Sequence, residues 1–353
     1  MDGNHRDPVV PGIKATAVGH GVRATPGSGG RLPAVSAPAI AAPAIAASVT
    51  AAADAALIRA AVLEWFATHG RPLNFRARRD PYAVLVSEAM AQQTQISRVE
   101  PAWEAFLGRF PTVEVLAAAP VADVLRAWQG MGYNRRALNL QRAARTVVDQ
   151  HRGRFPDTVA GLELLPGVGP YTARAIAAIA FGRAVGAVDT NVRRVLGRVA
   201  GGWAGMKPAM LQALADEMVP PGQAGEWTHA LMDIGARFCR PRTPVCGECP
   251  VRGWCTAAKD SASTPAAGGS APTAAAWSTA EVASATPFRS TSRWLRGRLV
   301  DRARGASGDG WVRVDDAIEP HEAGVVLAAA HRLAGEGLLE IHPADPALAR
   351  LPR

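Results

Sequence analysis

Residues 162–176 read LELLPGVGPYTARAI, and the helical architecture of the chain can be worked out from them. Gly167 and Gly169 flank Val168, and Pro170 begins an alanine-rich run. Glycine permits a tight turn and a close approach of the backbone to a ligand, while proline suits the first position of a helix. The segment therefore predicts two helices joined by a hairpin, with N–H groups at the start of the second helix available to an anion.

A phosphate of a DNA backbone is the anion that this hairpin predicts. A P-loop would need a Gly-Lys-Ser/Thr ending, which the segment lacks, and a dinucleotide fingerprint would need a preceding strand. Helices are expected on both sides instead. A helix–helix turn that binds nothing is the alternative when the segment is taken alone.

The charge of the chain agrees with a nucleic-acid partner. The 353 residues include 39 Lys and Arg against 30 Asp and Glu, a formal net charge of +9. Neutralisation of phosphates by basic side chains drives binding of this kind. The arginine- and alanine-rich usage of a GC-rich genome is the other interpretation of the same charge.

The hydropathy pattern excludes a membrane-spanning protein. No apolar run reaches the roughly 18 to 20 residues that a helical span needs, and the first residues lack the apolar segment of a signal peptide. We therefore expect a cytoplasmic protein, associated with the nucleoid of a bacterium and without a membrane partner.

Helical periodicity predicts an all-α body between segments of low complexity. Residues 1–52, rich in Ala, Pro, Gly, Val and Ser, are expected to form a disordered leader. Amphipathic segments without strand-like alternation follow over 53–256, and an Ala-, Ser-, Pro- and Gly-rich linker over 257–287. Residues 288–353, with a basic helix, a WVRV strand, a second helix and an LLEIH strand, predict a small winged-helix-like C-terminal module.

Expected helices within the body follow the apolar spacing. They are placed at 56–70, within 80–110, and at 121–130, 135–152, 170–182, 191–201, 207–219 and 226–239.

The cysteine spacing predicts a metal centre. Cys239, Cys246, Cys249 and Cys255 are the only cysteines, and clustering of this kind in a reducing compartment indicates metal binding rather than disulfides. Zinc usually takes two short pairs separated by a longer spacer, whereas here one short pair lies between two single cysteines. The spacing favours a [4Fe–4S] cluster ligated by four thiolates, with zinc as the alternative.

Two carboxylates are candidates for catalysis. Glu88 lies beside the apolar stripe of an expected helix, and burial raises a carboxyl pKa as a general acid near neutral pH requires. Asp189 precedes another expected helix and is an ordinary N-cap in the simplest interpretation. Thr190 and Asn191 can cap that helix as well, which would leave Asp189 free. The pair predicts an acid and an electrostatic stabiliser.

Six motifs occur together in a fixed order. Over residues 55–256 they make the chain resemble the helix-hairpin-helix DNA glycosylases of the endonuclease III superfamily, and within them the MutY-type, A/G-specific adenine glycosylases. The resemblance implies a six-helix barrel with the hairpin, a second subdomain with the [4Fe–4S] cluster, and a cleft that receives a base flipped out of the duplex. The motifs are SEAMAQQTQ (87–95), WQGMGYNRRA (128–137), LPGVGPYTA (165–173), VDTNVRRVLGR (188–198), ALMDIGA (230–236) and the four-cysteine loop (239–255).

The resemblance implies chemical roles for three residues. Glu88 would protonate adenine at N7, with a glutamate in the same role activating water, and Asp189 would stabilise the positively charged sugar. Bifunctional members have a lysine at the position of Tyr171, which forms a Schiff base with the sugar. A tyrosine cannot do so, and the resemblance therefore implies a monofunctional enzyme.

The resemblance also implies contacts with DNA. Gln93 and Thr94 match positions that enter the duplex beside the opposing base, and Met131 and Tyr133 match an intercalating loop. Without the motifs, Met131 and Tyr133 would be assigned to the core or to a helix surface. The hairpin residues Gly167, Val168 and Gly169 would hold the DNA backbone.

Three departures from the family affect substrate choice. Near the base pocket, expected to include Arg71, Phe75 and His229, the chain has Asn74-Phe75 in place of Pro-Trp. His229 replaces the Gln or Glu that pairs with the base in adenine glycosylases. No Phe-Ser-His loop of the family's NUDIX-like 8-oxoguanine-reading domain follows residue 256. Recognition of 8-oxoguanine is then expected to depend mostly on the catalytic body.

The sequence predicts a monomeric glycosylase that hydrolyses the N-glycosidic bond of adenine mispaired with 8-oxoguanine or guanine in double-stranded DNA. A glycosylase that removes T or U opposite G shares the Tyr and Asp positions; the Gln92–Thr94 run favours adenine, while His229 weakens that choice. A non-catalytic iron–sulfur damage sensor is the third hypothesis, but a sensor has no need of the two carboxylates.

Overall fold

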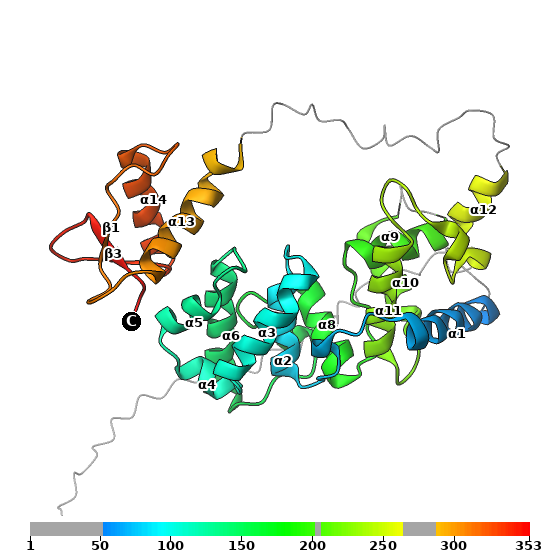
Figure 1. Ribbon diagram of the computed structural model, residues 1–353. Helices are drawn as coiled ribbons and strands as arrows, with labels where there is room; N and C mark the ends of the chain where they lie inside the picture. The colour runs from blue at the N-terminus through cyan, green and yellow to red at the C-terminus, as the bar shows by residue number, and fades with distance from the viewer. Residues whose placement is uncertain (1–51, 202–205, 264–286) are drawn as a thin grey trace, which may run out of the picture. The chain divides into compact units, whose positions relative to one another are not determined.

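The protein is described by a computed structural model over residues 52–201, 206–263 and 287–353 (Figure 1). The expected leader lies outside these residues except for its last position, and so does most of the expected linker. All described residues belong to one compact unit, Ala44–Arg353. Its α-helices are α1 (Ala52–His69), α2 (Pro81–Ala91), α3 (Ile96–Arg109), α4 (Val113–Ala118), α5 (Val121–Ala127), α6 (Arg135–His151), α7 (Val159–Glu163), α8 (Pro170–Phe181), α9 (Thr190–Val199), α10 (Pro208–Glu217), α11 (Ala224–Arg237), α12 (Thr256–Ser263), α13 (Ser292–Arg304) and α14 (Ala323–Gly335).

The helices bury two apolar clusters. The first combines residues of α2 to α8 with residues of α13 and α14. The second combines α1, α9, α10 and α11, and the cysteine loop packs against it. Helix α8 contributes to both, because Ile176 lies in the first cluster and Ala178 in the second. The described chain is thus mostly helical and has two helical subdomains that meet at α8.

The predicted hairpin lies between α7 and α8. The Thr158 side chain caps α7 by accepting a hydrogen bond from the Gly161 N–H at 3.2 Å. The chain then turns at Gly167, whose φ of 78° suits glycine. A Cβ at Gly167 would also lie 2.6 Å from Cβ of Asn139 in α6. Helix α8 begins at Pro170, as the sequence predicts.

The apolar stretch at 80–110 forms two helices rather than one. Helix α2 ends at Ala91, and the chain turns through Gln93, which has a φ of 55°. Helix α3 then begins at Ile96. The six-residue helix α4 was not expected, because so short an element carries little periodic signal.

The C-terminal module joins two helices to a small sheet. Strands β1 (Val312–Arg313), β2 (Glu340–Ile341) and β3 (Leu348–Arg350) form an antiparallel sheet in the order β1-β3-β2. The expected helices and the strand segments WVRV and LLEIH are present, whereas β3 was not expected. The strands make the chain mostly helical rather than all-α. In the described residues, no helix is long and apolar enough to cross a membrane.

Candidate active site

The site is built around Glu88 on α2. That helix begins with Pro81 after Asp80, whose side chain accepts a hydrogen bond from the Ala83 N–H at 2.9 Å. Seven residues later, Glu88 retains some solvent access while its neighbours in the helix are buried. Burial above all, with a smaller contribution from the nearby Asp189 charge, raises the pKa of Glu88 to about 7. The carboxyl group can therefore hold a proton near neutral pH.

Tyr171, the second residue of α8, lies against Glu88. The two side chains are hydrogen-bonded, and this bond opposes the rise in the pKa of Glu88. Burial, followed by the negative charges of Glu88 and Asp189, raises the pKa of Tyr171 well above its ordinary value. The phenol therefore stays protonated and donates to the carboxylate form of Glu88.

Asp189 caps α9 directly, and neither Thr190 nor Asn191 takes that place. Its Oδ1 accepts a hydrogen bond from the Val192 N–H at 2.7 Å, and its Oδ2 accepts one from the Asn191 Nδ2 at 2.9 Å. The expectation that another residue would cap the helix and free Asp189 is wrong. Because the same carboxylate also acts on Glu88 and Tyr171, the cap position itself brings Asp189 to the site.

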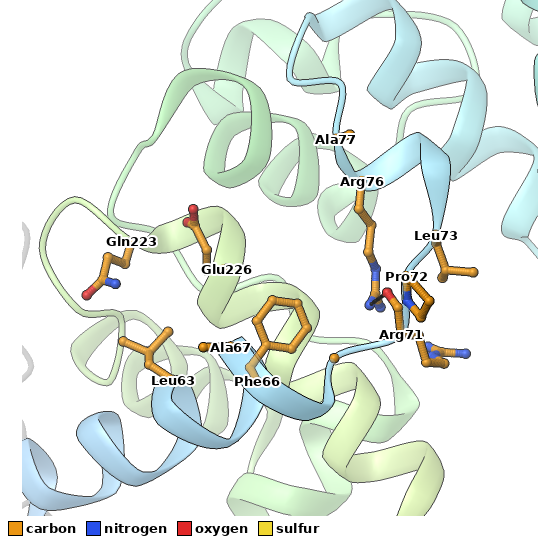
Figure 2. A pocket seen from close by; sticks show the side chains of 11 residues that line it. Leu63, Phe66, Ala67, Arg71, Pro72, Leu73, Arg76, Ala77, Gln223 and Glu226 are labelled. Carbon is orange, nitrogen blue, oxygen red and sulfur yellow. Dashed lines mark hydrogen bonds between the residues drawn. The ribbon is translucent and has the colours of Figure 1, made fainter.

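A cavity of about 420 Å³ opens between α1, the segment after it and α11 (Figure 2), and Glu88, Tyr171 and Asp189 are not among the residues that line it. Arg76 links the cavity to Glu88, since it lines the cavity and its charge acts on the carboxyl of Glu88. Of the predicted base-pocket residues, Arg71 lines the cavity. The other lining residues are Leu63, Phe66, Ala67, Gly70, Pro72, Leu73, Ala77, Gln223 and Glu226.

The other two predicted base-pocket residues, His229 and Phe75, do not line the cavity themselves. The His229 ring lies 6.5 Å from the ring of Phe66, which lines the cavity. Burial, followed by the charge of Arg76, lowers the pKa of His229 to about 3, so the imidazole is neutral at physiological pH. Phe75 packs edge-on against Trp103, with ring centroids 6.2 Å apart. A neutral imidazole offers one donor and one acceptor.

The start of α8 has no side-chain cap. Its N-cap is Gly169, with a φ of −92°, and nothing lies within 4 Å of the position where a Cβ would stand. The first N–H groups of a helix have no intrahelical acceptor, and they carry partial positive charge. The start of α8 thus leaves its first N–H groups without a side-chain acceptor, and phosphate binding there stays a prediction. Val168, between the two glycines, is buried.

The four cysteines lie in the loop after α11 as free thiols. Burial above all, with smaller contributions from the other three cysteines, raises the pKa of Cys249 to about 11. Arg198 of α9 reaches the loop, with its NH1 3.3 Å from the Sγ of Cys239. Thiolates gathered in this way need a positive partner, which the iron of a cluster would supply.

The donor set of the loop, four cysteines within 17 residues, matches the four thiolates that ligate a [4Fe–4S] cluster. Zinc needs its ligands around one point. The four irons of a cubane each take one thiolate, so the sulfurs are spread further apart.

Comparison with known proteins agrees with this geometry. Residues 86–221 match the family model described as HhH-GPD superfamily base excision DNA repair protein, and residues 239–255 match the iron-sulfur binding domain of endonuclease III. The adenine DNA glycosylase of Mycobacterium tuberculosis is 40% identical over 250 residues, which cover 69% of this chain and 78% of that protein. The chain belongs to the HhH-GPD superfamily. The four-cysteine loop is its endonuclease III iron–sulfur domain, consistent with a [4Fe–4S] cluster.

Other relatives and structures extend the comparison. The human adenine DNA glycosylase is 42% identical over 214 residues, or 56% of this chain, but this HhH-GPD chain spans only 39% of the human protein. A thermostable thymine-DNA glycosylase structure has a TM-score of 0.56 at 29% identity, and the match covers 59% of this chain and 98% of that one. A non-covalent endonuclease III–DNA complex, at 23% identity and a TM-score of 0.51, shares the fold.

The HhH-GPD site also contains an ion cluster that the sequence did not reveal. The side chain of Asp233 on α11 is 3% exposed and accepts hydrogen bonds from the Arg71 Nε at 2.7 Å and from the Arg76 NH1 and NH2 at 2.9 and 2.7 Å. Burial alone would raise the pKa of Asp233, but the arginine hydrogen bonds bring it below its ordinary value. The cluster fixes Arg71 and Arg76 along the cavity. The ALMDIGA motif, which holds Asp233, was the available signal.

Arg136 of α6 joins the two segments that the resemblance assigned to the DNA duplex. Its NH1 donates to the carbonyl oxygens of Ala89, Met90 and Gln92 at 2.7, 3.0 and 2.7 Å. Its NH2 donates to the Thr94 Oγ1 at 3.2 Å and to the Met131 carbonyl at 2.8 Å. The Arg136 guanidinium thus hydrogen-bonds both to the C-terminal end of α2 and to the loop before α6.

The predicted duplex-entering residues differ in exposure. Gln93 and Tyr133 have φ values of 55° and 44°, and in the described residues only Arg152 is a further non-glycine with positive φ. Strained backbone of this kind gathers at functional sites. Tyr133 is 37% exposed, whereas Met131 is 5% exposed and belongs to the core. Of the predicted pair Met131 and Tyr133, the structure therefore presents only the tyrosine to a partner.

Proposed function

We propose that this protein is a monofunctional adenine DNA glycosylase, which removes adenine mispaired with 8-oxoguanine or guanine from double-stranded DNA. The observation that carries the proposal is the carboxyl group of Glu88, which has a pKa of about 7 and lies beside Tyr171 and Asp189. The names of relatives about 40% identical support the choice of adenine.

The proposed reaction breaks the bond between adenine and the sugar C1′. Glu88 donates its proton to N7 of the flipped adenine, which leaves as the neutral base. Asp189, held by the Val192 N–H and the Asn191 side chain, stabilises the positive charge that develops on the sugar. The carboxylate of Glu88 then takes a proton from the water that adds to C1′. The product is an intact abasic site, since Tyr171 offers no amine for a Schiff base.

The cavity beside Arg71 is the proposed base pocket. Its volume of about 420 Å³ accommodates a purine, and Asp233 holds Arg71 and Arg76 in fixed positions. His229 would recognise the base through the neutral ring behind Phe66, and Phe75 would support the pocket through its contact with Trp103. A protonated histidine there would repel the cationic adenine that forms during the reaction.

The proposed DNA contacts come from three places. The uncapped N-terminus of α8, with Gly167, Val168 and Gly169, would bind the phosphate backbone. Gln93 and Thr94 on one side, and Tyr133 on the other, would enter the duplex near the mispair.

The C-terminal module, with its α13, β1, α14, β2, β3 order, would be winged-helix-like, and the enzyme would act as a monomer on nucleoid DNA.

The proposed cofactor role is structural. Cys239, Cys246, Cys249 and Cys255 would hold a [4Fe–4S] cluster, which supplies a rigid cross-link for the loop. Arg194 and Arg198 connect this loop to α9, since Arg194 donates to the Cys239 carbonyl oxygen and Arg198 contacts the Cys239 Sγ. Asp189 is the N-cap of the same helix, so the cross-link would steady the proposed catalytic carboxylate.

A pyrimidine glycosylase acting on G·T or G·U is the second candidate. It is favoured by the likeness to a thymine-DNA glycosylase structure at 29% identity and by a histidine at the base pocket. A non-catalytic damage sensor is disfavoured by the Glu88 environment, because keeping a protonated carboxyl beside a second carboxylate serves no purpose in binding alone.

One experiment separates these functions. The protein is incubated with duplexes that hold 8-oxoguanine·A, G·A, G·T or G·U, and abasic sites are then cleaved with alkali. We expect cleavage of the adenine strands in the first two duplexes. Cleavage of only the pyrimidine strands would replace adenine by thymine or uracil as the substrate, and no cleavage by cluster-loaded protein would support the sensor.

The Glu88→Gln variant tests the acid directly. It should bind the 8-oxoguanine·A duplex as tightly as the wild type and release no adenine, because glutamine cannot donate the proton. Borohydride trapping on the same duplex checks the monofunctional assignment, and strong trapping of the wild type would contradict it.

A further inference from the structure

The exposed ring of Tyr133 lies between two arginines from different parts of the chain. Arg136 of α6 places its guanidinium carbon 5.5 Å from the ring centroid, and Arg293 of α13 places its own at 3.9 Å. Arg136 is occupied by the carbonyl oxygens described above. By these two distances, Arg293 is the closer cation to the ring, and it belongs to the C-terminal module.

Arg293 differs from three of the four other arginines of α13, which pair with carboxylates; the fourth, Arg302, donates to the carbonyl oxygen of Arg313. Arg296, Arg298 and Arg304 each form an ion pair with a carboxylate, whereas Arg293 forms none within the described part of the chain. Its guanidinium contacts two aromatic rings instead, those of Tyr133 at 3.9 Å and Phe288 at 5.8 Å. Phe288 is 59% exposed. An unneutralised arginine thus lies at an exposed aromatic surface that continues from Tyr133.

A second arginine of α13, Arg304, joins the C-terminal module to the segment that holds Tyr133. The Arg304 Nε donates to the Leu125 carbonyl oxygen at 2.9 Å, and its NH2 donates to the Oδ1 of Asn134 at 2.7 Å. The Arg304 side chain is 6% exposed, so these bonds are shielded from water. Asn134 directly follows Tyr133. Arg304 therefore sets the distance between α13 and the tyrosine.

We propose that the C-terminal module positions Tyr133 for insertion into DNA, with Arg293 as the positioning residue and Arg304 as its anchor. Stacking of a guanidinium on an exposed tyrosine is worth on the order of a three- to tenfold change in an equilibrium constant. It holds the ring in one orientation, so less rotamer freedom is lost when the ring enters the duplex. This inference rests on the proposed contact of Tyr133 with DNA.

A double-mutant cycle tests the proposal. Dissociation constants for an 8-oxoguanine·A duplex are measured with full-length protein that carries Glu88→Gln, so that the DNA stays intact. Arg293→Ala should weaken binding about three- to tenfold, and Tyr133→Ala should weaken it more. In the Tyr133→Ala background, Arg293→Ala should have no further effect, because the ring that it positions is gone.

Two further variants identify the cause. Arg293→Lys keeps the charge but not the planar group, so it should lose most of the effect if the contact is stacking and little if Arg293 only attracts phosphates. Arg298→Ala, which removes a 57% exposed charge from another face of the same helix, should leave binding unchanged. Thermal unfolding of each variant shows whether the fold is intact.

The outcomes separate the inference from the proposed function. Equal losses from Arg293→Ala with and without Tyr133, full retention by Arg293→Lys, or an equal loss from Arg298→Ala would overturn the positioning role. Unchanged binding by Tyr133→Ala would remove the proposed DNA contact and this inference together. Whether the wild type excises adenine is measured independently, and its failure would count against the proposed activity alone.

Discussion

Helices α8 and α9 begin in opposite ways, although both bring a residue to the candidate site. Helix α8 follows Gly169 and has no side-chain cap. Helix α9 follows Asp189, whose carboxylate caps it. Every helix start presents partial positive charge. At α8 that charge is left for an external anion, and at α9 it is occupied by an internal one. The difference separates an end that is proposed to bind the DNA backbone from an end that holds the proposed catalytic carboxylate.

Asp189→Asn gives the largest expected effect, because it removes the charge and keeps the cap. Asparagine is as good an N-cap as aspartate, so the thermal unfolding midpoint should change little. The rate of adenine release in single turnovers should fall about 10²- to 10³-fold, since the stabilising charge is lost. Asp189→Ala serves as the comparison, with a similar rate loss and a further loss of about 1 kcal/mol in stability. An active Asp189→Asn enzyme would reduce Asp189 to a helix cap.

The start of each helix could be predicted because its chemistry is local. Gly167, Gly169 and Pro170 indicate a hairpin and a helix start within a few residues of each other. The choice of Asp189 over Thr190 or Asn191 as the cap could not be predicted, because all three types can cap. The structure shows that Asp189 is the residue used.

The parts that could not be predicted join residues distant in the sequence. Arg71 and Asp233 are 162 positions apart, and neither carries a local pattern that names the other. Arg136 reaches the carbonyl oxygens at the end of α2 from more than 40 positions away. That contact helps to explain why the stretch at 80–110, within which the sequence predicts helix without locating a break, divides into α2 and α3.

The pH dependence of stability provides the next test, because the closeness of Asp189 contributes to the raised pKa of Glu88. The folded-state pKa of about 7 lies above the ordinary value of 4.5, so the folded state binds the proton more tightly. The stabilising contribution is fully present below pH 4.5 and is lost as the pH rises to about 7. Glu88→Gln has no charge to bury. Relative to the wild type, it should be more stable at pH 8 by on the order of 2 kcal/mol and nearly equal at pH 5.

Denaturant unfolding at the two pH values measures this difference. Asp80→Asn is the matched control, because it neutralises a carboxylate that caps the same helix while asparagine retains the cap. A constant difference between Glu88→Gln and the wild type from pH 5 to pH 8 would show that Glu88 is ionised throughout, and the acid would have to be sought elsewhere.

Gly169→Asp makes the start of α8 resemble that of α9, and it has the smallest expected effect. The backbone φ of −92° accepts a side chain, and nothing lies within 4 Å of a Cβ there. The new carboxylate should cap α8 and stabilise the protein by about 0.5–1 kcal/mol. It should also weaken DNA binding about tenfold, because it takes the N–H groups and repels the phosphate. Gly169→Asn separates the two causes, since it caps without charge and should weaken DNA binding less. If Gly169→Asp binds DNA as tightly as the wild type, the uncapped end of α8 is a turn between helices and the phosphate site lies elsewhere.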